Sequence, residues 1–198
     1  SYGDLFTYEK SRRGKGLAVT GFHGDKNKTV IFQNRSGNTP VVEIADDSFS
    51  NSPTEEAILT EGIAYIGRNA FSGCNRLHQV VLPISIEEIE DSAFENCSSL
   101  KSVSLPMALK TIGNNALRGT GLRTVEIPKS VFWLGDGLLA DCQAMEQVTI
   151  PENVSKIPDR MFEGCIHLKK VELPENLDSI GDRAFWGCSS LDFLVIPD

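Results

Sequence analysis

The sequence lacks any apolar run long enough to span a membrane, and it shows no secretory signal at its start. The chain begins at Ser1 without a methionine, so we expect a mature form or a trimmed version of a longer protein. We therefore expect no transmembrane segment in this chain, and its location must be inferred from other features.

Basic charge is also scarce. The chain has 19 lysines and arginines against 27 aspartates and glutamates, which gives a formal net charge of −8. Nucleic-acid phosphates require a basic face, so the composition argues against nucleic acid as a partner. The single basic cluster is "KSRRGK" (Lys10–Lys15), and we expect it to be a solvated N-terminal arm rather than a binding site.

Catalytic signatures are missing as well. The chain has only three histidines, and it contains no HExxH, GxSxG, Walker or GxGxxG pattern. The acidic residues are scattered over positions where solvation explains them better than acid–base chemistry. We therefore expect no enzyme, no cofactor and no metal site.

One phrase, by contrast, is repeated: "AFSGCNRL", "AFENCSSL", "MFEGCIHL" and "AFWGCSSL". Its cysteines recur every 23 residues, except that Thr120 stands where one cysteine is due. The prolines keep the same period of 22 or 23 residues, at Pro83, Pro106, Pro128, Pro151, Pro174 and Pro197. A fixed period of this length is typical of a solenoid of stacked repeats.

A single repeat predicts one coil of such a solenoid. Val80 and Leu82 alternate with Gln79 and Val81, which indicates a short strand with Val80 and Leu82 facing inward, and Pro83 ends it. Ile86 and Ile89 form a second inward pair. The segment "DSAFENC" (residues 91–97) has the spacing of a tight helical turn with one buried face. A coil cannot bury these residues alone, but stacked coils share one continuous core.

The repeated cysteine is expected to be a buried free thiol. Adjacent coils should lie about 4.8 Å apart with parallel Cβ vectors, whereas a disulfide needs Cβ atoms about 3.8 Å apart. Thr120 interrupts the column without disturbing the period, so pairing is not essential. A straight column also does not converge as the four ligands of a zinc site must.

The repeat resembles the BspA-like, or treponemal-type, leucine-rich repeat. "IGRNAFSGCNRL" (Ile66–Leu77) and "IGDRAFWGCSSL" (Ile180–Leu191) match that consensus almost letter for letter, and the resemblance covers Val41–Asp198. It implies an α/β repeat: a right-handed solenoid with a parallel strand ladder and short helical turns. Residues 41–198 would hold about seven repeats of 22–23 residues, after an arm and capping region at 1–40. Within that region, Leu17–Phe32 looks like a capping β-hairpin, and residues 33–40 form a loop insertion.

The resemblance also implies a role. Proteins of this family are often secreted or surface proteins, and some act as adhesins. This points to a non-enzymatic binding module, extracellular or on the cell surface, for a host or matrix protein or a glycan. A structural spacer that presents another domain at the cell envelope is the alternative. The acidic net charge disfavours acidic glycans and therefore favours a neutral one.

Two surfaces are candidates for ligand binding. Outward strand positions form two columns of mostly short polar side chains, a strip that comprises Gln79, Ser102, Ser104, Thr124, Glu126, Gln147, Thr149, Lys170 and Glu172. A plain solvated sheet explains this strip equally well. Phe132 and Trp133 stand where other repeats carry mostly polar or small residues, either as a binding spot or with one ring turned inward.

The last repeat, "FLVIPD", is not followed by a covering coil in this sequence. Repeat arrays need polar terminal caps. Either the natural chain continues, or this end meets a partner. Self-association through Trp186 and Phe193 is therefore expected in the second case.

Overall fold

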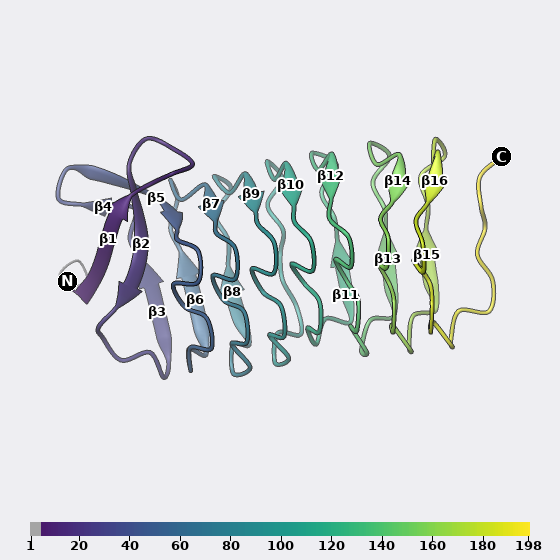
Figure 1. The fold of residues 1–198 in the computed structure, drawn as a ribbon, viewed down its shortest axis with the longest axis horizontal. Coiled ribbons are helices and arrows are strands. Elements are labelled where there is room, and N and C mark those ends of the chain that lie inside the picture. The colour runs from purple at the N-terminus through teal and green to yellow at the C-terminus, as the bar shows by residue number, and fades with distance from the viewer. Residues whose placement is uncertain (1–4) are drawn as a thin grey trace.

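The computed structural model describes residues 5–198; the first four residues of the predicted N-terminal region lie outside the described part. The chain winds into stacked coils that run from a capped N-terminal end to an open C-terminal coil (Figure 1). Most coils contribute one strand to each of two parallel rows. The first row contains β3 (Thr29–Phe32), β6 (Glu56–Leu59), β8 (Gln79–Val81), β11 (Thr124–Glu126), β13 (Gln147–Thr149) and β15 (Lys170–Glu172). The second row contains β5 (Thr39–Ile44), β7 (Tyr65–Ile66), β9 (Glu88–Ile89), β10 (Thr111–Ile112), β12 (Trp133–Leu134), β14 (Lys156–Ile157) and β16 (Ser179–Ile180).

The predicted parallel ladder and its register are confirmed. Glu56 pairs with Gln79 in the first row, and Thr124 pairs with Gln147, which pairs with Lys170. This register aligns the outward columns as the repeat spacing predicts. It also stacks the inward side chains into one core that runs the length of the solenoid.

The N-terminal cap is a β-hairpin, but it lies earlier in the chain than predicted. β1 (Phe6–Lys10) pairs antiparallel with β2 (Leu17–Phe22), and β2 then pairs parallel with β5 of the second row. β3, the second half of the expected hairpin, instead opens the first row by pairing with β6. The insertion is a tight hairpin in which β4 (Arg35–Ser36) folds back on the start of β5 around Gly37.

The predicted short helical turns are wrong: the described residues contain no α-helix. In each coil, two residues four positions apart have a positive φ, as at Asn69 (55°) and Gly73 (74°), and this left-handed conformation cannot continue a right-handed helix. Within each of these turns, every second backbone N–H donates a hydrogen bond to a carbonyl of the same turn, as from Cys74 to Phe71. The alternate N–H groups donate to the next coil instead, as from Phe71 to the carbonyl of Ala93.

These turns form a third ladder that joins consecutive coils from the turn at Asp47 to the turn at Asp182. Acidic and amide side chains reinforce it: each accepts a hydrogen bond from a backbone N–H of the following coil. The pairs are Asp46 with Arg68 (2.7 Å), Asp91 with Asn114 (2.7 Å), Asn114 with Asp136 (2.8 Å), Asp136 with Asp159 (3.1 Å) and Asp159 with Asp182 (2.9 Å). The turn face is therefore the continuous backbone connection of the solenoid.

The two strand rows are each interrupted, which the repeat spacing did not predict. In the first row, residues 101–105 form no strand, so β8 and β11 are not joined through them. In the second row, β12 pairs only with β10, and β14 pairs only with β16. Pro158 explains the second break, because it has no N–H to donate to Leu134, whereas Gly135 and Gly181 donate to the preceding coil at this position.

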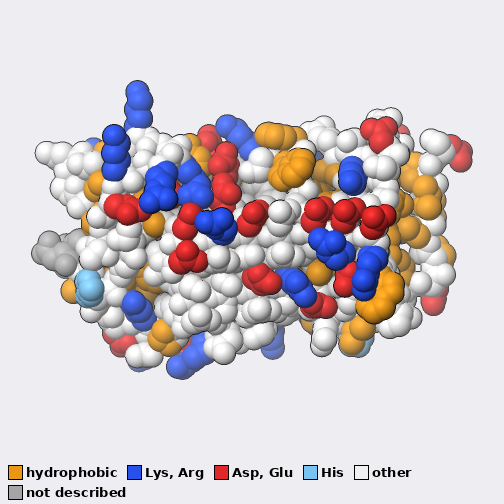
Figure 2. Space-filling view, viewed as in Figure 1, with side chains coloured by type: hydrophobic (Ala, Val, Ile, Leu, Met, Phe, Trp, Pro, Cys, Tyr) orange, Lys and Arg blue, Asp and Glu red, His pale blue; other side chains and the backbone are white. Residues whose placement is uncertain are grey.

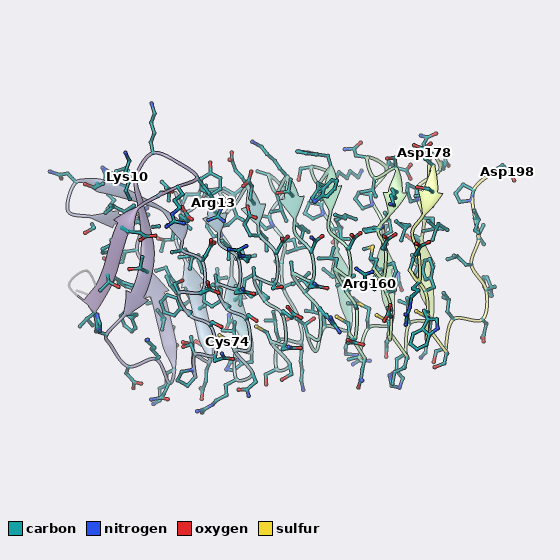
Figure 3. All side chains as sticks on the ribbon, viewed as in Figure 1. Lys10, Arg13, Cys74, Arg160, Asp178 and Asp198 are labelled. Atoms are coloured by element: carbon teal, nitrogen blue, oxygen red, sulfur yellow. The ribbon has the colours of Figure 1, made fainter. Side chains whose placement is uncertain are left out.

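The basic segment at Lys10–Lys15 is in part a structural clamp, not a solvated arm. The β1–β2 loop folds back over the second row and brings Arg13 against it (Figure 3). Arg13 pairs with Glu43, with Asp46 at 3.0 Å and with Glu90 at 3.5 Å. Ser11, which is buried, donates to the other oxygen of Glu43. The cap is thereby tied to two coils, those of β5 and β9.

All five cysteines are free thiols, as predicted, and their role is more specific than filling space. Each S–H donates to a carbonyl of the preceding coil. The pairs are Cys74 with Phe49 (3.1 Å), Cys97 with Phe71 (3.2 Å), Cys142 with Leu117 (3.1 Å), Cys165 with Leu139 (3.0 Å) and Cys188 with Phe162 (3.1 Å). Thr120 cannot continue this pattern because its hydroxyl donates within its own turn, to Leu117 at 2.9 Å.

Burial makes these thiols unreactive in the folded protein. It raises the pKa of Cys74 to about 11, and it also raises the pKa values of Cys97, Cys142 and Cys165. Because the folded pKa lies above the unfolded value of about 8.5, the stabilisation is complete below that pH and is lost as the pH rises through the folded pKa.

We expect iodoacetamide at pH 8 to modify all five cysteines in denaturant without reductant. In the native protein all five should react slowly; half-buried Cys188 should be the fastest because its sulfur is the most accessible, although burial raises its pKa to about 11 as well. Urea unfolding should also show a lower midpoint at pH 10 than at pH 7.5. A mass spectrum with any disulfide-linked pair, or rapid native modification of Cys97, would contradict this assignment.

Candidate functional site

The outward strip lies over a continuous depression in the first row. Three adjoining open hollows, of about 510, 650 and 630 Å³, follow one another from β8 across residues 102–105 to β13. Seven of the nine predicted strip residues line them: Gln79, Ser102, Ser104, Thr124, Glu126, Gln147 and Thr149. All seven are exposed, so the structure brings them together on one accessible surface, named here the polar groove.

The remaining two strip residues lie beyond the polar groove. Lys170 and Glu172 form an ion pair with each other at 2.9 Å, and Glu172 accepts a hydrogen bond from Thr149 at 3.0 Å. The bonds from Lys170 and Thr149 lower the pKa of Glu172. These two side chains thus satisfy each other and mark the end of the groove.

The floor of the polar groove is more apolar than the outward columns predict. Val103 and Leu105 are only half-buried because their segment is not paired in the row, and Met107 at the rim is 78% exposed. Lys129 lines the two larger hollows. Val103 and Leu105 lie 23 residues after Val80 and Leu82, at positions that the repeat pattern predicts to face the core, so the pattern could not reveal this part of the surface.

The aromatic pair is exposed, which contradicts the inward-turned interpretation, and its role as a binding spot stays a prediction. Phe132 is 62% and Trp133 59% exposed, and neither ring turns inward. Figure 2 shows a hydrophobic patch over the second row, with basic side chains on either side. At one position of each coil the core holds a large side chain, and these side chains form the core column: Phe49, Phe71, Phe94, Leu117, Leu139 and Phe162. Leu117 and Leu139 are buried in this column, and neither aromatic residue of the exposed pair takes part in it.

The C-terminal coil also exposes apolar side chains. Phe193 is 78% exposed and Ile196, expected to face inward, is 61% exposed, because residues 191–198 form no strand with β15. Trp186 is 61% exposed and lies 4.6 Å from the guanidinium of Arg183 in a cation–π contact. Both predicted self-association residues are accessible, and their association stays a prediction.

No arrangement for metal binding is found among residues 5–198: no group of three or more histidine, cysteine, aspartate or glutamate side chains is placed to hold an ion. Of the histidines, His167 contacts the carbonyl of Gln143 at 2.6 Å, and His78 lies at the edge of the polar groove. The same residues contain no helix long and apolar enough to cross a membrane.

The repeat period, the stacked coils and the column of cysteines are features that can be compared with known protein families. A sequence model described as the BspA type leucine rich repeat region matches residues 22–146 and 134–198, with six copies. The chain belongs to this family. None of the curated proteins compared with it matches at a significant level.

Several solved structures are similar over nearly the whole chain. A leucine-rich repeat protein of T. pallidum is 32% identical, with a TM-score of 0.90 over 95% of this chain and 88% of that one. One from Bacteroides ovatus is 27% identical with a TM-score of 0.75, and the match covers 98% of this chain but 58% of that one. The pneumococcal vaccine antigen PcpA, at 18% identity and a TM-score of 0.61 over 98% of this chain and 69% of that one, shares the fold.

Proposed function

We propose that this protein is a non-enzymatic binding module, extracellular or on the cell surface, that engages a protein or glycan through its outward faces. The observation that carries the proposal is the polar groove, in which seven strip residues predicted separately line three adjoining hollows. The short hydroxyl side chains of the strip lose little conformational entropy on binding, and its glutamines add amide donors and acceptors. Their repeat of about 4.8 Å along the solenoid suits an extended chain, either a peptide or a glycan.

Charge and family membership support an external partner of restricted chemistry. A formal net charge of −8 favours a neutral glycan or a host or matrix protein with basic patches over an acidic polysaccharide. The family resemblance is to proteins that are often surface-located, and one protein with this fold is a pneumococcal vaccine antigen.

A spacer is the second candidate, and the turn ladder favours it. Backbone hydrogen bonds join consecutive coils from residue 47 to residue 182, with side-chain oxygens accepting additional bonds at five junctions. Such a rod suits a domain that holds another part of a protein away from a surface. Its outward columns would then have no ligand.

The test is binding to a panel of immobilised matrix proteins and neutral glycans. We expect the wild type to bind at least one of them, and Ser102→Glu/Thr149→Glu to bind it at least threefold more weakly, because two added carboxylates would then line the groove. The matched control is Asn75→Glu/Gln143→Glu, which adds the same charge at two exposed turn residues outside the polar groove. A ligand whose affinity is the same for both double variants would place binding outside the polar groove, and no ligand at all would favour the spacer.

A further inference from the structure

One segment of the first row is unpaired on both of its sides. Residues 101–105 lie between β8 and β11, and Figure 1 shows plain ribbon between these two arrows in the row. Where the row is paired, the residue before a strand donates its N–H to the preceding coil, as Glu146 does to Arg123 at 2.8 Å. Within residues 5–198, the N–H of Lys101 makes no such bond to the coil before it, and the N–H of Arg123 makes none to Lys101.

The turn that leads into β11 belongs to a shortened repeat. Leu122 follows Leu100 by 22 residues, whereas the interval before Leu100 is 23. The N–H of Leu100 donates to the carbonyl of Cys97 at 3.1 Å, and in the described part of the chain the N–H of Leu122 has no equivalent bond. A Cβ added at Gly121 would lie 2.6 Å from the carbonyl oxygen of Ser98, so the short turn runs close to the preceding coil. This corner is therefore tight, but it contains fewer hydrogen bonds than the corresponding corners of other coils.

The thiol contact between coils is missing at the same junction. At the equivalent positions each cysteine donates to the preceding coil, whereas the hydroxyl of Thr120 donates to Leu117 in its own turn at 2.9 Å. The carbonyl of Phe71 accepts the S–H of Cys97 at 3.2 Å, but among the described residues no side chain of the next coil donates to the carbonyl of Phe94. The coil with residues 101–105 is thus less strongly joined to the next coil, both in the first row and at the corner.

The other two sides of this junction are intact. In the turn ladder, Phe94 donates to Ala116 at 2.9 Å and Asn96 donates to Arg118 at 2.8 Å. In the second row, β9 pairs with β10 and β10 pairs with β12. The coils around residues 101–105 are therefore joined along two sides and free along the side that bears the polar groove. Such an array can bend about its intact sides, because no ladder hydrogen bond has to break.

We propose that the solenoid has a hinge at residues 101–105, and that bending there widens and narrows the polar groove. The turn ladder and the second row form the hinge line, and the first row is the side that opens. Val103 and Leu105, which are half-buried in the groove floor, become more exposed as the row opens. A ligand that spans the groove from β8 to β13 would select one width and shift the equilibrium toward it. The hinge is a property of the fold and goes beyond the proposed function, because it exists whether or not a ligand binds.

The experiment measures distances between pairs of spin labels by electron paramagnetic resonance. Gln79→Cys/Lys170→Cys places the labels on exposed first-row residues on either side of the hinge. Arg68→Cys/Arg160→Cys is the matched control, because both residues are exposed and the continuous turn ladder joins their coils. We expect the distance distribution of the first pair to be at least twice as broad as that of the control pair. The unmutated protein, taken through the same labelling, gives the background from the native thiols.

A repair variant tests the cause of the hinge. Thr120→Cys with Gly121→Ser and a second serine inserted before Leu122 copies residues 97–99 into the shortened turn. We expect the first-row distance distribution to narrow to nearly the control width, because the turn regains its thiol donor and its corner N–H. A serine inserted after Gly37, where no atom lies within 4 Å of an added Cβ, is the control insertion and should leave the width unchanged. Circular dichroism should show that both variants remain folded.

Hydrogen exchange gives an independent measurement of the same junction. The N–H groups of residues 101–105 and of Leu122 should exchange at least tenfold faster than those of β8, and at least threefold more slowly in the repair variant than in the wild type. Equal widths for the two label pairs, an unchanged width in the folded repair variant, or equal protection of residues 101–105 and β8 would each overturn the hinge. None of these results touches the proposed function, which is judged separately by panel ligands that respond to Ser102→Glu/Thr149→Glu.

Discussion

Replacing Arg13 by alanine is expected to lower the free energy of unfolding by about 3 kcal/mol. The reason is the position of Glu43, whose side chain is only 3% exposed and pairs with Arg13. Removing one partner of a buried ion pair leaves an uncompensated charge, which costs about 3–5 kcal/mol. The Arg13 side chain is itself 22% exposed, so water can enter the space that it leaves. That water will solvate the Glu43 carboxylate and recover part of the cost.

The effect should extend beyond one pair because Arg13 also reaches Asp46 and Glu90. Burial raises the pKa of Glu90, and Arg13 opposes that shift by favouring the carboxylate. Arg13→Lys should recover only part of the loss, since an ammonium group cannot present the guanidinium fork to three carboxylates at once. The cap, which is held to the coils through this residue, should therefore loosen in both variants.

Urea unfolding followed by circular dichroism measures the effect. Arg12→Ala is the matched control, since Arg12 is exposed and forms no ion pair within residues 5–198, and we expect a change within about 0.5 kcal/mol. The double variant Arg13→Ala/Glu43→Gln should be less destabilised than the sum of its single variants, because the buried charge is gone. If Arg13→Ala is no more destabilised than Arg12→Ala, the clamp does not stabilise the cap.

The parts of the fold that depend on period could be predicted from the sequence. The spacing of cysteines and prolines indicates stacked coils, and the alternation at Val80 and Leu82 indicates which side chains face inward. The aromatic pair could be located for the same reason, because Phe132 and Trp133 depart from a column whose other members are known. A repeated pattern makes each position comparable with its equivalents.

The parts of the fold that depend on backbone conformation or on long-range contacts could not be predicted from the sequence. Residues 91–97 have the side-chain spacing of a helix, but Ser92 has a φ of 57°. A serine in the sequence does not indicate this left-handed conformation. Arg13 and Glu90 meet across three coils, and only the path of the β1–β2 loop brings them together. The half-buried Val103 and Leu105 look like core residues in sequence because their pattern matches every other strand.

The second large effect on stability is expected from a substitution in the core column. Phe94→Ala is expected to lower the free energy of unfolding by about 3–5 kcal/mol, the usual cost of removing a buried phenylalanine ring. Phe94 is 2% exposed, and its ring stacks on that of Phe71 with centroids 5.3 Å apart and planes within 2°. Its other neighbour in the column is Leu117, so no second ring can move in to fill the cavity.

Phe94→Leu is the matched variant, and the protein itself indicates that leucine fits this column. Leu117 and Leu139 occupy the equivalent positions of the next two coils and are fully buried. We therefore expect Phe94→Leu to cost less than about 1.5 kcal/mol, as substitutions that roughly conserve volume do. Val81→Ala, at the 39% exposed outward position of β8, should change stability by about 0.5 kcal/mol or less.

The form of the unfolding curve is as informative as its midpoint. Stacked coils are stabilised mainly by contacts with their neighbours, so a cavity in the middle of the array weakens the coupling between its two halves. The first row is already interrupted at residues 101–105, beside the coil that carries Phe94. Phe94→Ala should consequently show a smaller m-value or a second transition in urea, whereas Phe94→Leu should keep a single one. Equal midpoints and equal slopes for the two variants would mean that the ring stack contributes little and that the turn ladder alone couples the coils.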